Sequence, residues 1–186
     1  NVDATVVLTV GTDCAVGKKT AALELTEAAR ARGHDAAFVP TGQTGIMIAG
    51  WGTPVDAVPS DFTAGAVEQM ILEKGDEHDW LFVEGQGTIV HPGYSGVACG
   101  ILHGAMPDAL VLCHTAGRTH IHGFDSFALP PLRDYVHLHE DLAGPVKPTR
   151  VAAGALNTQA VEDKSAARAA VERYSAAIGR PAADPI

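Results

Sequence analysis

The sequence predicts an α/β fold with a mostly parallel sheet and helices on both of its faces. Three observations support this prediction. Short apolar runs rich in β-branched residues are continuous rather than alternating, which is typical of strands covered by helices on both faces. Helical stretches separate these runs, and that alternation favours parallel strands joined by right-handed crossovers. A glycine-rich segment containing lysine joins the first run to the first helix.

The apolar runs predict five strands, at residues 5–10, 36–39, 80–83, 109–113 and 151–156. Helices are expected between or after them, at residues 18–32, 62–74, 95–105 and 159–178. Gly33 is a normal stop for the first helix. Asp61 is the expected N-cap of the second helix, because aspartate is favoured at that position.

The chain length of 186 residues fits one α/β domain, which we assign to residues 1–178. A Pro- and Ala-rich tail at 179–186 is expected to fray. Hydrophobic residues make up 46% and charged residues 19% of the chain, which excludes a disordered protein. The formal charge of -9 argues against nucleic acid and anionic membranes as partners, because both require a basic face.

Three widely spaced cysteines without a CxxC pair indicate reduced thiols and a cytoplasmic location. No apolar run approaches the ~20 residues of a membrane-spanning helix, and no secretory signal sequence opens the chain. The first residue, Asn1, lies almost directly before a predicted strand. We therefore expect the chain to be one domain of a longer protein.

The segment after the first strand reads GTDCAVGKKT and predicts a phosphate site. A glycine-rich turn between a strand and a helix lets backbone N–H groups converge on a phosphate, and a lysine closes over the outer phosphates. Gly17 and Lys18 match the core of the Walker A pattern, and Thr20 offers a hydroxyl to a metal ion. The predicted cofactor-binding residues are Thr12, Asp13, Cys14, Ala15, Val16, Gly17, Lys18, Lys19 and Thr20.

Two positions depart from the standard Walker A pattern. Thr12 replaces its first glycine, and Lys19 stands where Ser or Thr follows the lysine. A tight turn with a solvated lysine pair is the alternative. Strand, loop, lysine and helix nevertheless occur in the required order, which favours a fold like that of P-loop nucleoside triphosphate hydrolases. Cys14 is not the favoured nucleophile, because the sequence offers it no base partner.

Glu84 ends the third predicted strand and precedes a glycine turn. Ligands of parallel sheets bind beyond the carboxyl ends of the strands, so an acid there can hold Mg²⁺ beside phosphate oxygens. A solvated strand-end carboxylate is the alternative. Asp61 has two open interpretations, a helix cap and a general base. His91 is a further candidate for proton transfer, although a loop histidine is more often polar surface.

Polar residues follow the second strand and the fourth strand as well. Residues 40–45 form a loop suited to a small polar ligand, and Gln43, Thr44 and Gly45 are its candidate substrate contacts. Arg118 is a candidate clamp for a carboxylate or a phosphate. Four histidines between residues 120 and 139 are interpreted as a polar surface stretch rather than a zinc site, because no Cys or acid completes a known spacing.

Several segments together carry a family resemblance. GTDCAVGKKT resembles the phosphate loop of dethiobiotin synthetase, and VEGQG resembles a segment of the same group. A closer match covers nearly the whole chain. GTDCAVGKKTAALEL, PTGQTGIMIAGWG, DAVPSDFTAGAVE, HPGYSGV and PDALVLCHTAGR together resemble the C-terminal P-loop domain of the D-glutamate N-acetyltransferase-like family, formerly a domain of unknown function.

The closer resemblance implies a cytoplasmic bacterial or archaeal enzyme that transfers acetyl to the amino group of D-glutamate. It also implies an N-terminal Rossmann-like domain outside this chain. The resemblance to dethiobiotin synthetase implies that Glu84 is the metal-site acid. That enzyme has a lysine near residues 40–45 that this chain lacks. Gln86, within VEGQG, is a further candidate substrate contact.

The prediction is therefore an N-acyltransferase-like P-loop domain whose loop holds the diphosphate of acetyl-CoA. The acceptor is an amino acid amine that loses its proton to Asp61, Glu84 or His91, while loop donors stabilise the oxyanion. Two alternatives stay open. One is an ATP-dependent kinase or ligase with Mg²⁺ at Thr20 and Glu84. The other is a regulatory nucleotide-binding module. We also expect a homo-oligomer.

Overall fold

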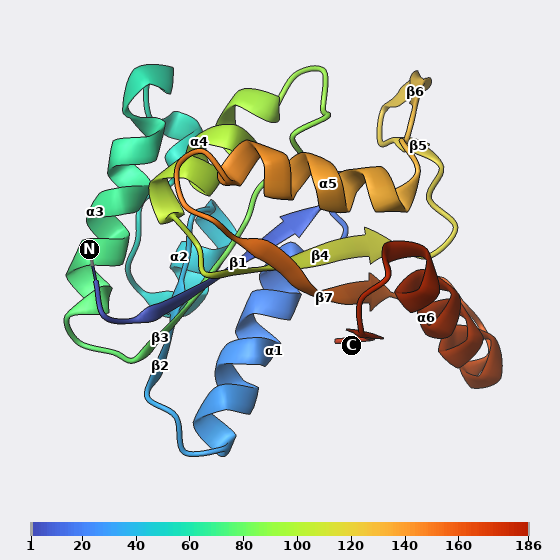
Figure 1. Cartoon of the computed structure of the whole chain (residues 1–186), viewed down its shortest axis with the longest axis horizontal. Coiled ribbons are helices and arrows are strands. Elements are labelled where there is room, and N and C mark those ends of the chain that lie inside the picture. Colours follow the sequence, from blue (N-terminus) through green and yellow to red (C-terminus); the bar gives the residue numbers. More distant parts are fainter. Residues whose placement is uncertain (1, 186) are drawn as a thin grey trace.

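In the computed structural model, which describes residues 2–185, the chain folds around a six-stranded parallel sheet with the order β2-β3-β1-β4-β7-β8 (Figure 1). Its strands are β1 (Thr5–Gly11), β2 (Ala36–Val39), β3 (Trp80–Val83), β4 (Ala109–Thr115), β7 (Arg150–Asn157) and β8 (Ala182–Ala183). A separate hairpin pairs β5 (His120–Ile121) with β6 (Phe124–Ala128). The α/β fold predicted from the sequence is confirmed.

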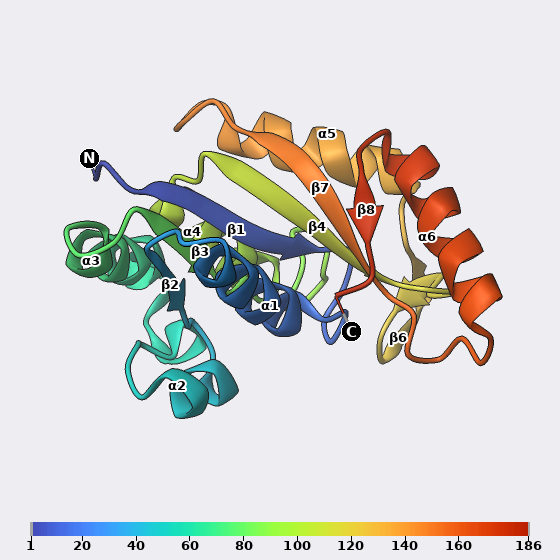
Figure 2. The same cartoon turned by 90° about the horizontal axis from the view of Figure 1, so that it is seen from below.

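Helices cover the two faces of the sheet unequally. The helix α1 (Lys18–Ala31) lies on one face, whereas α3 (Thr63–Gly75), α4 (Ser95–Ala105) and α5 (Leu132–Ala143) lie on the other (Figure 2). The helix α6 (Lys164–Ile178) runs beside β7 and β8 at one edge of the sheet, and the short α2 (Gln43–Ala49) projects beyond β2 at the other. Two short 3-10 helices, η1 (Val55–Ala57) and η2 (Ser60–Phe62), lead into α3.

The central strand β1 is buried on both faces, and this explains its continuous apolar sequence. Val6, Leu8 and Val10 belong to the larger core, which lies under α3, α4 and α5. Val7 belongs to the smaller core beneath α1. Each such side chain contributes about 1.5–3 kcal/mol when removed from water. The two cores together hold the carboxyl ends of the strands in place.

Three local predictions are wrong. Helix α6 begins at Lys164 rather than at residue 159, because the Asp163 side chain accepts the Ala166 N–H and caps the helix there. Asp61 does not cap α3; it lies in η2, and the N-cap residue is Phe62. The tail does not simply fray, since β8 pairs in parallel with β7.

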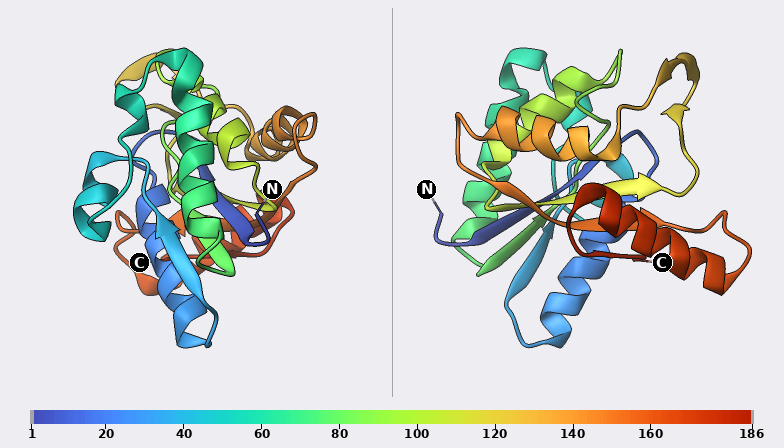
Figure 3. Two further views of the ribbon diagram at one scale, coloured as in Figure 1. Left: turned by 90° about the vertical axis from the view of Figure 1, so that its left-hand side faces the viewer. Right: turned by 45° about the vertical axis from the view of Figure 1, so that its right-hand side comes forward.

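Helices α2 and α5 and the β5–β6 hairpin were not predicted from the sequence. The polar loop expected at residues 40–45 runs into α2. The histidine stretch interpreted as surface overlaps α5, and His139 on that helix is 1% exposed. Figure 3 shows that the hairpin and α6 extend past the strand ends. In the part of the chain that the structure describes, no helix has the length and apolarity to span a membrane.

Candidate functional site: the phosphate-loop cleft

A cleft of about 640 Å³ lies at the carboxyl ends of β1, β3 and β7. Parallel α/β sheets bind their ligands in this place. The cleft brings together nine residues predicted from the sequence: Cys14, Ala15, Val16, Gly17, Lys18, Lys19, Thr20, Glu84 and Gln86. The phosphate loop and the predicted metal-site acid therefore line a single cleft.

The backbone of the loop is shaped to present donors. Gly17 has φ +97°, in the left-handed region that favours glycine, and Ala15 has φ +53°. The backbone N–H groups of Ala15, Val16 and Gly17 make no hydrogen bond to other residues among 2–185. Unpaired N–H groups in a turn before a helix form an anion site, and the partial positive charge of the helix end adds to it.

The side chain of Lys18 lies inside the loop. Its Nζ donates a 2.7 Å hydrogen bond to the Asp13 carbonyl oxygen, and the residue is only 6% exposed. Burial lowers the pKa of Lys18, since a charged ammonium is costly away from water. A Cβ on Gly11 would lie 3.0 Å from this Nζ, so the absence of a side chain at Gly11 makes room for the Lys18 side chain. An incoming phosphate would supply a negatively charged partner for the buried ammonium of Lys18.

Asp13 anchors the loop rather than lining the cleft. Its carboxylate is fully buried and accepts hydrogen bonds from Cys14 N–H at 2.7 Å, from Arg118 at 2.5 Å and from His122 N–H at 2.8 Å. Arg118, predicted as a substrate clamp, is thus engaged with Asp13, and it does not line the cleft. The pair holds the loop against the β5–β6 hairpin.

Thr12 is fully buried behind the loop and also lies outside the cleft. Its Oγ1 is 2.7 Å from Nδ1 of His114 on β4, and its carbonyl accepts the Tyr135 hydroxyl of α5. Burial lowers the pKa of His114 to about 4, so this imidazole is neutral at pH 7. Thr12 therefore fixes the start of the loop to β4 through His114 and to α5 through Tyr135.

Glu84 is 7% exposed and borders the cleft. Its Oε2 accepts the N–H groups of Thr41 and Gly42, each at 3.1 Å, so the loop after β2 orients the carboxylate. Burial raises the pKa of Glu84, and these hydrogen bonds oppose the shift. A Cβ on Gly45 would lie only 2.3 Å from Oε2. Gly45 thus acts by making room for Glu84, not by lining the cleft.

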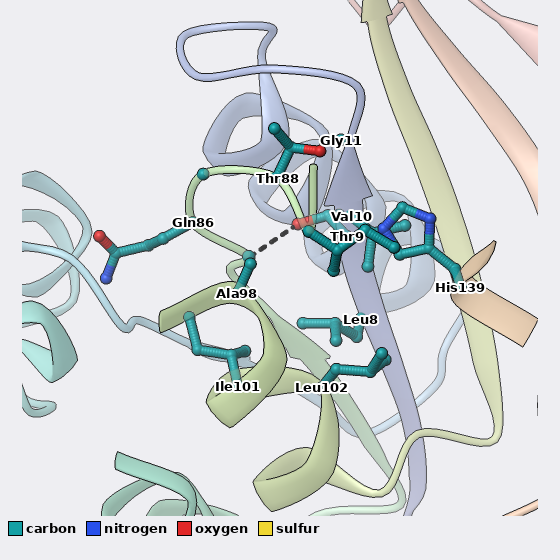
Figure 4. Close-up of a pocket in the computed structure, with 13 residues that line it drawn as sticks. Leu8, Thr9, Val10, Gly11, Gln86, Thr88, Ala98, Ile101, Leu102 and His139 are labelled. Atoms are coloured by element: carbon teal, nitrogen blue, oxygen red, sulfur yellow. Dashed lines mark hydrogen bonds between the residues drawn. The ribbon is translucent and has the colours of Figure 1, made fainter. Parts of the chain in front are cut away.

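The loop after β3 approaches β1 very closely at Gly85. A Cβ there would lie 1.8 Å from the Thr9 carbonyl oxygen, and the Gly85 N–H donates to Thr9 Oγ1 at 3.1 Å (Figure 4). Beneath this contact lies a cavity of about 10 Å³, the size of one water molecule. Thr88 Oγ1 at its wall is buried and has no hydrogen-bond partner among residues 2–185. The cavity is too small for a cofactor.

Four other predicted site residues lie outside the cleft. Gln43 and Thr44 are exposed on α2, and Gln43 donates to Asp56. Asp61 is exposed on η2. His91 is not polar surface, because it is 2% exposed. Of the three proton acceptors predicted from the sequence, Glu84 alone lines the cleft.

His91 lies beside Asp13 and Cys14, with potential ligand atoms of the three residues within 4.8 Å of one another. The cluster is poorly suited to a metal ion. Nδ1 of His91 accepts N–H groups from Gly93 and Tyr94, so the ring proton is on Nε2. The carboxylate of Asp13 is already ion-paired with the guanidinium of Arg118. Burial raises the pKa of Cys14, which argues against an activated thiolate.

Several residues of the cleft wall were not predicted from the sequence, namely Asp56, Val97, Asn157 and Gln159; Tyr94, in the loop that carries His91, also lines the cleft. Asn157 ends β7 and lies 3.8 Å from the Cβ that Gly17 would carry. Its place at a strand's carboxyl end is the feature that could have identified it. The ring of Tyr94 stacks on His91, with centroids 4.4 Å apart. No local pattern marks that contact.

The chain is similar to a family of undetermined function. A family model described as a domain of unknown function, the DUF1611 C-terminal P-loop domain, matches residues 1–186. Two curated proteins called D-glutamate N-acetyltransferase are also similar. One, from Tritonibacter scottomollicae, is 40% identical over 183 residues; the other, from a Pseudoalteromonas species, is 39% identical over 180 residues. The chain spans about half of their lengths, 53% and 54%, while 96% of this chain is covered.

Solved structures agree with this likeness. A crystal structure of a DUF1611 family protein from Anabaena variabilis has a TM-score of 0.94 at 43% identity, over 98% of this chain and 54% of that one. The signal recognition particle 54 kDa protein of Aeropyrum pernix, solved with GDP, has a TM-score of 0.62 at 14% identity. That alignment covers 97% of this chain and 40% of the other. At such low identity it shows the fold alone.

Proposed function

Because the chain belongs to the DUF1611 P-loop domain family, we propose that it is the cofactor-binding domain of an N-acetyltransferase. Acetyl-CoA is the proposed donor, and an amino acid related to D-glutamate is the proposed acceptor. The observation that carries this proposal is the row of unpaired N–H groups at Ala15, Val16 and Gly17 beside Lys18. Coenzyme A contains a diphosphate, which such a cradle suits. The relatives named D-glutamate N-acetyltransferase support the choice of reaction.

Each part of the cleft has a role in this proposal. Bound acetyl-CoA would supply a thioester carbonyl that the deprotonated amine can attack. The new C–N bond replaces the C–S bond, and coenzyme A leaves as the thiol after its sulfur takes up a proton. Lys18 and the loop N–H groups hold phosphate oxygens. Glu84 takes the proton of the substrate ammonium, since its raised pKa brings it closer to the pKa of an amine. Asp61 and His91 take no part in this step.

A second function is favoured by one specific observation. Thr20 and Glu84 line the same cleft as Lys18. A hydroxyl and a carboxylate are oxygen ligands of the kind that Mg²⁺ prefers, and Mg²⁺ would bring with it the phosphates of ATP. The residues therefore also fit an ATP-dependent transfer, in which Lys18 would stabilise the transferred phosphoryl group.

Product analysis separates the two functions. The full-length protein is incubated with D-glutamate and either acetyl-CoA or Mg-ATP, while free thiol, ADP and inorganic phosphate are measured. Thiol release that depends on D-glutamate, without formation of ADP or phosphate, is the expected result. Formation of ADP that depends on D-glutamate, without thiol release, would replace the acetyl-transfer proposal with the ATP-dependent one. Tight nucleotide binding without either product would indicate a regulatory module.

A matched pair of variants ties the result to the cleft. Lys18→Ala is expected to abolish the thiol release because it removes the cationic partner of the phosphates. Lys164→Ala, at the exposed start of α6, should leave it unchanged. Full thiol release by the Lys18 variant would contradict the proposed role of the loop.

A further inference from the structure

A second cavity, of about 590 Å³, lies apart from the phosphate-loop cleft. It is bounded by α5, α6 and the carboxyl ends of β4 and β7, and we call it the α6 cavity. Its walls include Leu132, Leu156, Ala166, Ala170, Arg173 and Tyr174. None of its lining residues also lines the phosphate-loop cleft. The volume lies within the range of about 300–1,000 Å³ that is usual for small-molecule sites.

The cavity exists because α6 packs on the domain mainly through its C-terminal half. Tyr174 and Ile178 are buried there, at 3% and 1% exposure. In the N-terminal half, Ala166 and Ala170 face the cavity, and a methyl group is too short to fill the space. Figure 3 shows α6 running outward past the sheet. An apolar wall is thereby left open beside the core.

Two polar side chains give this apolar cavity its chemical character. His114 contributes to the wall, is 7% exposed and is neutral at pH 7. Arg173 is exposed at the cavity and forms no ion pair within residues 2–185. The cavity therefore combines apolar walls, a neutral imidazole and one uncompensated guanidinium. A guanidinium is complementary in charge and shape to a carboxylate.

We propose that the α6 cavity binds a small carboxylic acid with an apolar body. The carboxylate would pair with Arg173, and the apolar body would lie against Leu132, Leu156 and the alanines of α6. This site is separate from the proposed acetyl-transfer cleft and does not depend on that function. It adjoins the phosphate loop, because His114 is hydrogen-bonded to Thr12.

Octanoate is a suitable probe, and octanamide is its neutral counterpart. Isothermal titration of the chain is expected to show octanoate binding up to about fivefold tighter than octanamide. This ratio corresponds to about 1 kcal/mol, the upper end of the range for an exposed ion pair. Arg173→Gln should remove this preference. Arg168→Gln, on the same helix but outside the cavity, should keep it. An unchanged preference in the Arg173 variant would overturn the proposal.

A cavity-filling variant tests the apolar walls. Ala166→Phe is expected to weaken octanoate binding at least about tenfold, since the ring would occupy the space. Ala176→Phe, on the same helix outside the cavity, is the matched control and should bind normally. Saturating coenzyme A should not displace octanoate. Displacement by coenzyme A, or equal binding by both phenylalanine variants, would place the probe elsewhere and contradict the α6 site.

Discussion

Asp13 and Glu84 follow two neighbouring strands, β1 and β3, yet their buried carboxylates have opposite surroundings. Asp13 has Arg118 and two backbone N–H groups as partners. Glu84 has two backbone N–H groups, no ion pair within residues 2–185, and the cleft before it. The first carboxylate is fully compensated, whereas the second still has capacity for a proton, a metal ion or a substrate amine.

Burial alone does not identify a functional acid in this chain. A buried carboxylate with a guanidinium partner contributes to structure, because its charge is already neutralised where it lies. A buried carboxylate without a cation retains an electrostatic cost that a ligand can relieve. We therefore assign Asp13 to anchoring the phosphate loop, and we propose Glu84 as the acid that takes part in the reaction.

The largest expected effect is on the β1 side of this comparison. Asp13→Ala should lower the free energy of unfolding by about 3–5 kcal/mol, because it leaves a partly buried guanidinium and two N–H groups without their acceptor. Chemical denaturation measures this. Glu27→Ala breaks an exposed pair with Arg30 and should cost less than about 1 kcal/mol. Equal effects of the two substitutions would refute the anchoring role of Asp13.

The next effect is the pH dependence of stability at the two strand ends. The pKa of His114 falls from 6.5 to about 4 on folding, so the unfolded chain binds more protons between these values. Stability from His114 is complete above pH 6.5 and is lost towards pH 4, by about 3 kcal/mol. His139, whose pKa is also about 4, acts in the same direction.

Glu84 acts in the opposite direction, since its raised pKa makes its contribution present at low pH and lost as pH rises. Urea titrations from pH 4 to 7 on the wild type and His114→Gln measure the balance. The variant is expected to show a shallower loss of stability below pH 6.5. Parallel profiles for the two proteins would show that His114 is not the titrating group.

A smaller effect concerns ligand affinity at the loop between the two acids. Lys18→Ala should weaken coenzyme A binding at least about tenfold, equivalent to about 1.4 kcal/mol. Stability should hardly fall, because burial of the Lys18 ammonium is itself unfavourable. Calorimetric titration measures the dissociation constant. An unchanged constant would argue against phosphate binding at this loop.

The smallest effect on stability is expected at Glu84 itself. Glu84→Gln keeps an oxygen that can accept the Thr41 and Gly42 N–H groups, so the unfolding free energy should change by less than about 1 kcal/mol. Turnover of the full-length protein should nevertheless fall about 100-fold through loss of the base. A large loss of stability together with normal turnover would reverse the assignment of the two acids.

Much of the fold could be predicted because its elements depend on local patterns. Strands β2 and β3 and helix α4 have the predicted bounds, since apolar runs and helical periodicity mark them directly. Helix α5 escaped prediction because its polar histidines suggested surface, although His139 turns inward. The start of α6 was misplaced because Asp163, rather than the end of β7, begins that helix.

The site divides in the same way. Cys14 to Thr20 are consecutive in the chain, so their joint position at the cleft follows from one strand–loop–helix pattern. The pairing of Asp13 with Arg118 crosses 105 residues, and no local pattern specifies it. Arg118 was predicted as a clamp because it follows the fourth strand and its guanidinium matches a carboxylate or a phosphate. In the folded chain its partner is Asp13.

By itself the sequence determined the parallel sheet, the phosphate loop and the acid at the end of β3, because strand–loop–helix order and apolar runs are local properties. Only the tertiary structure decided which polar residues face the cleft and which form ion pairs or hydrogen bonds with one another. Compensation depends on distances between segments far apart in the chain, as with Thr41 and Glu84, and on burial that no single segment controls. That is why Asp13 and Glu84, which both follow strands of the sheet, have different surroundings.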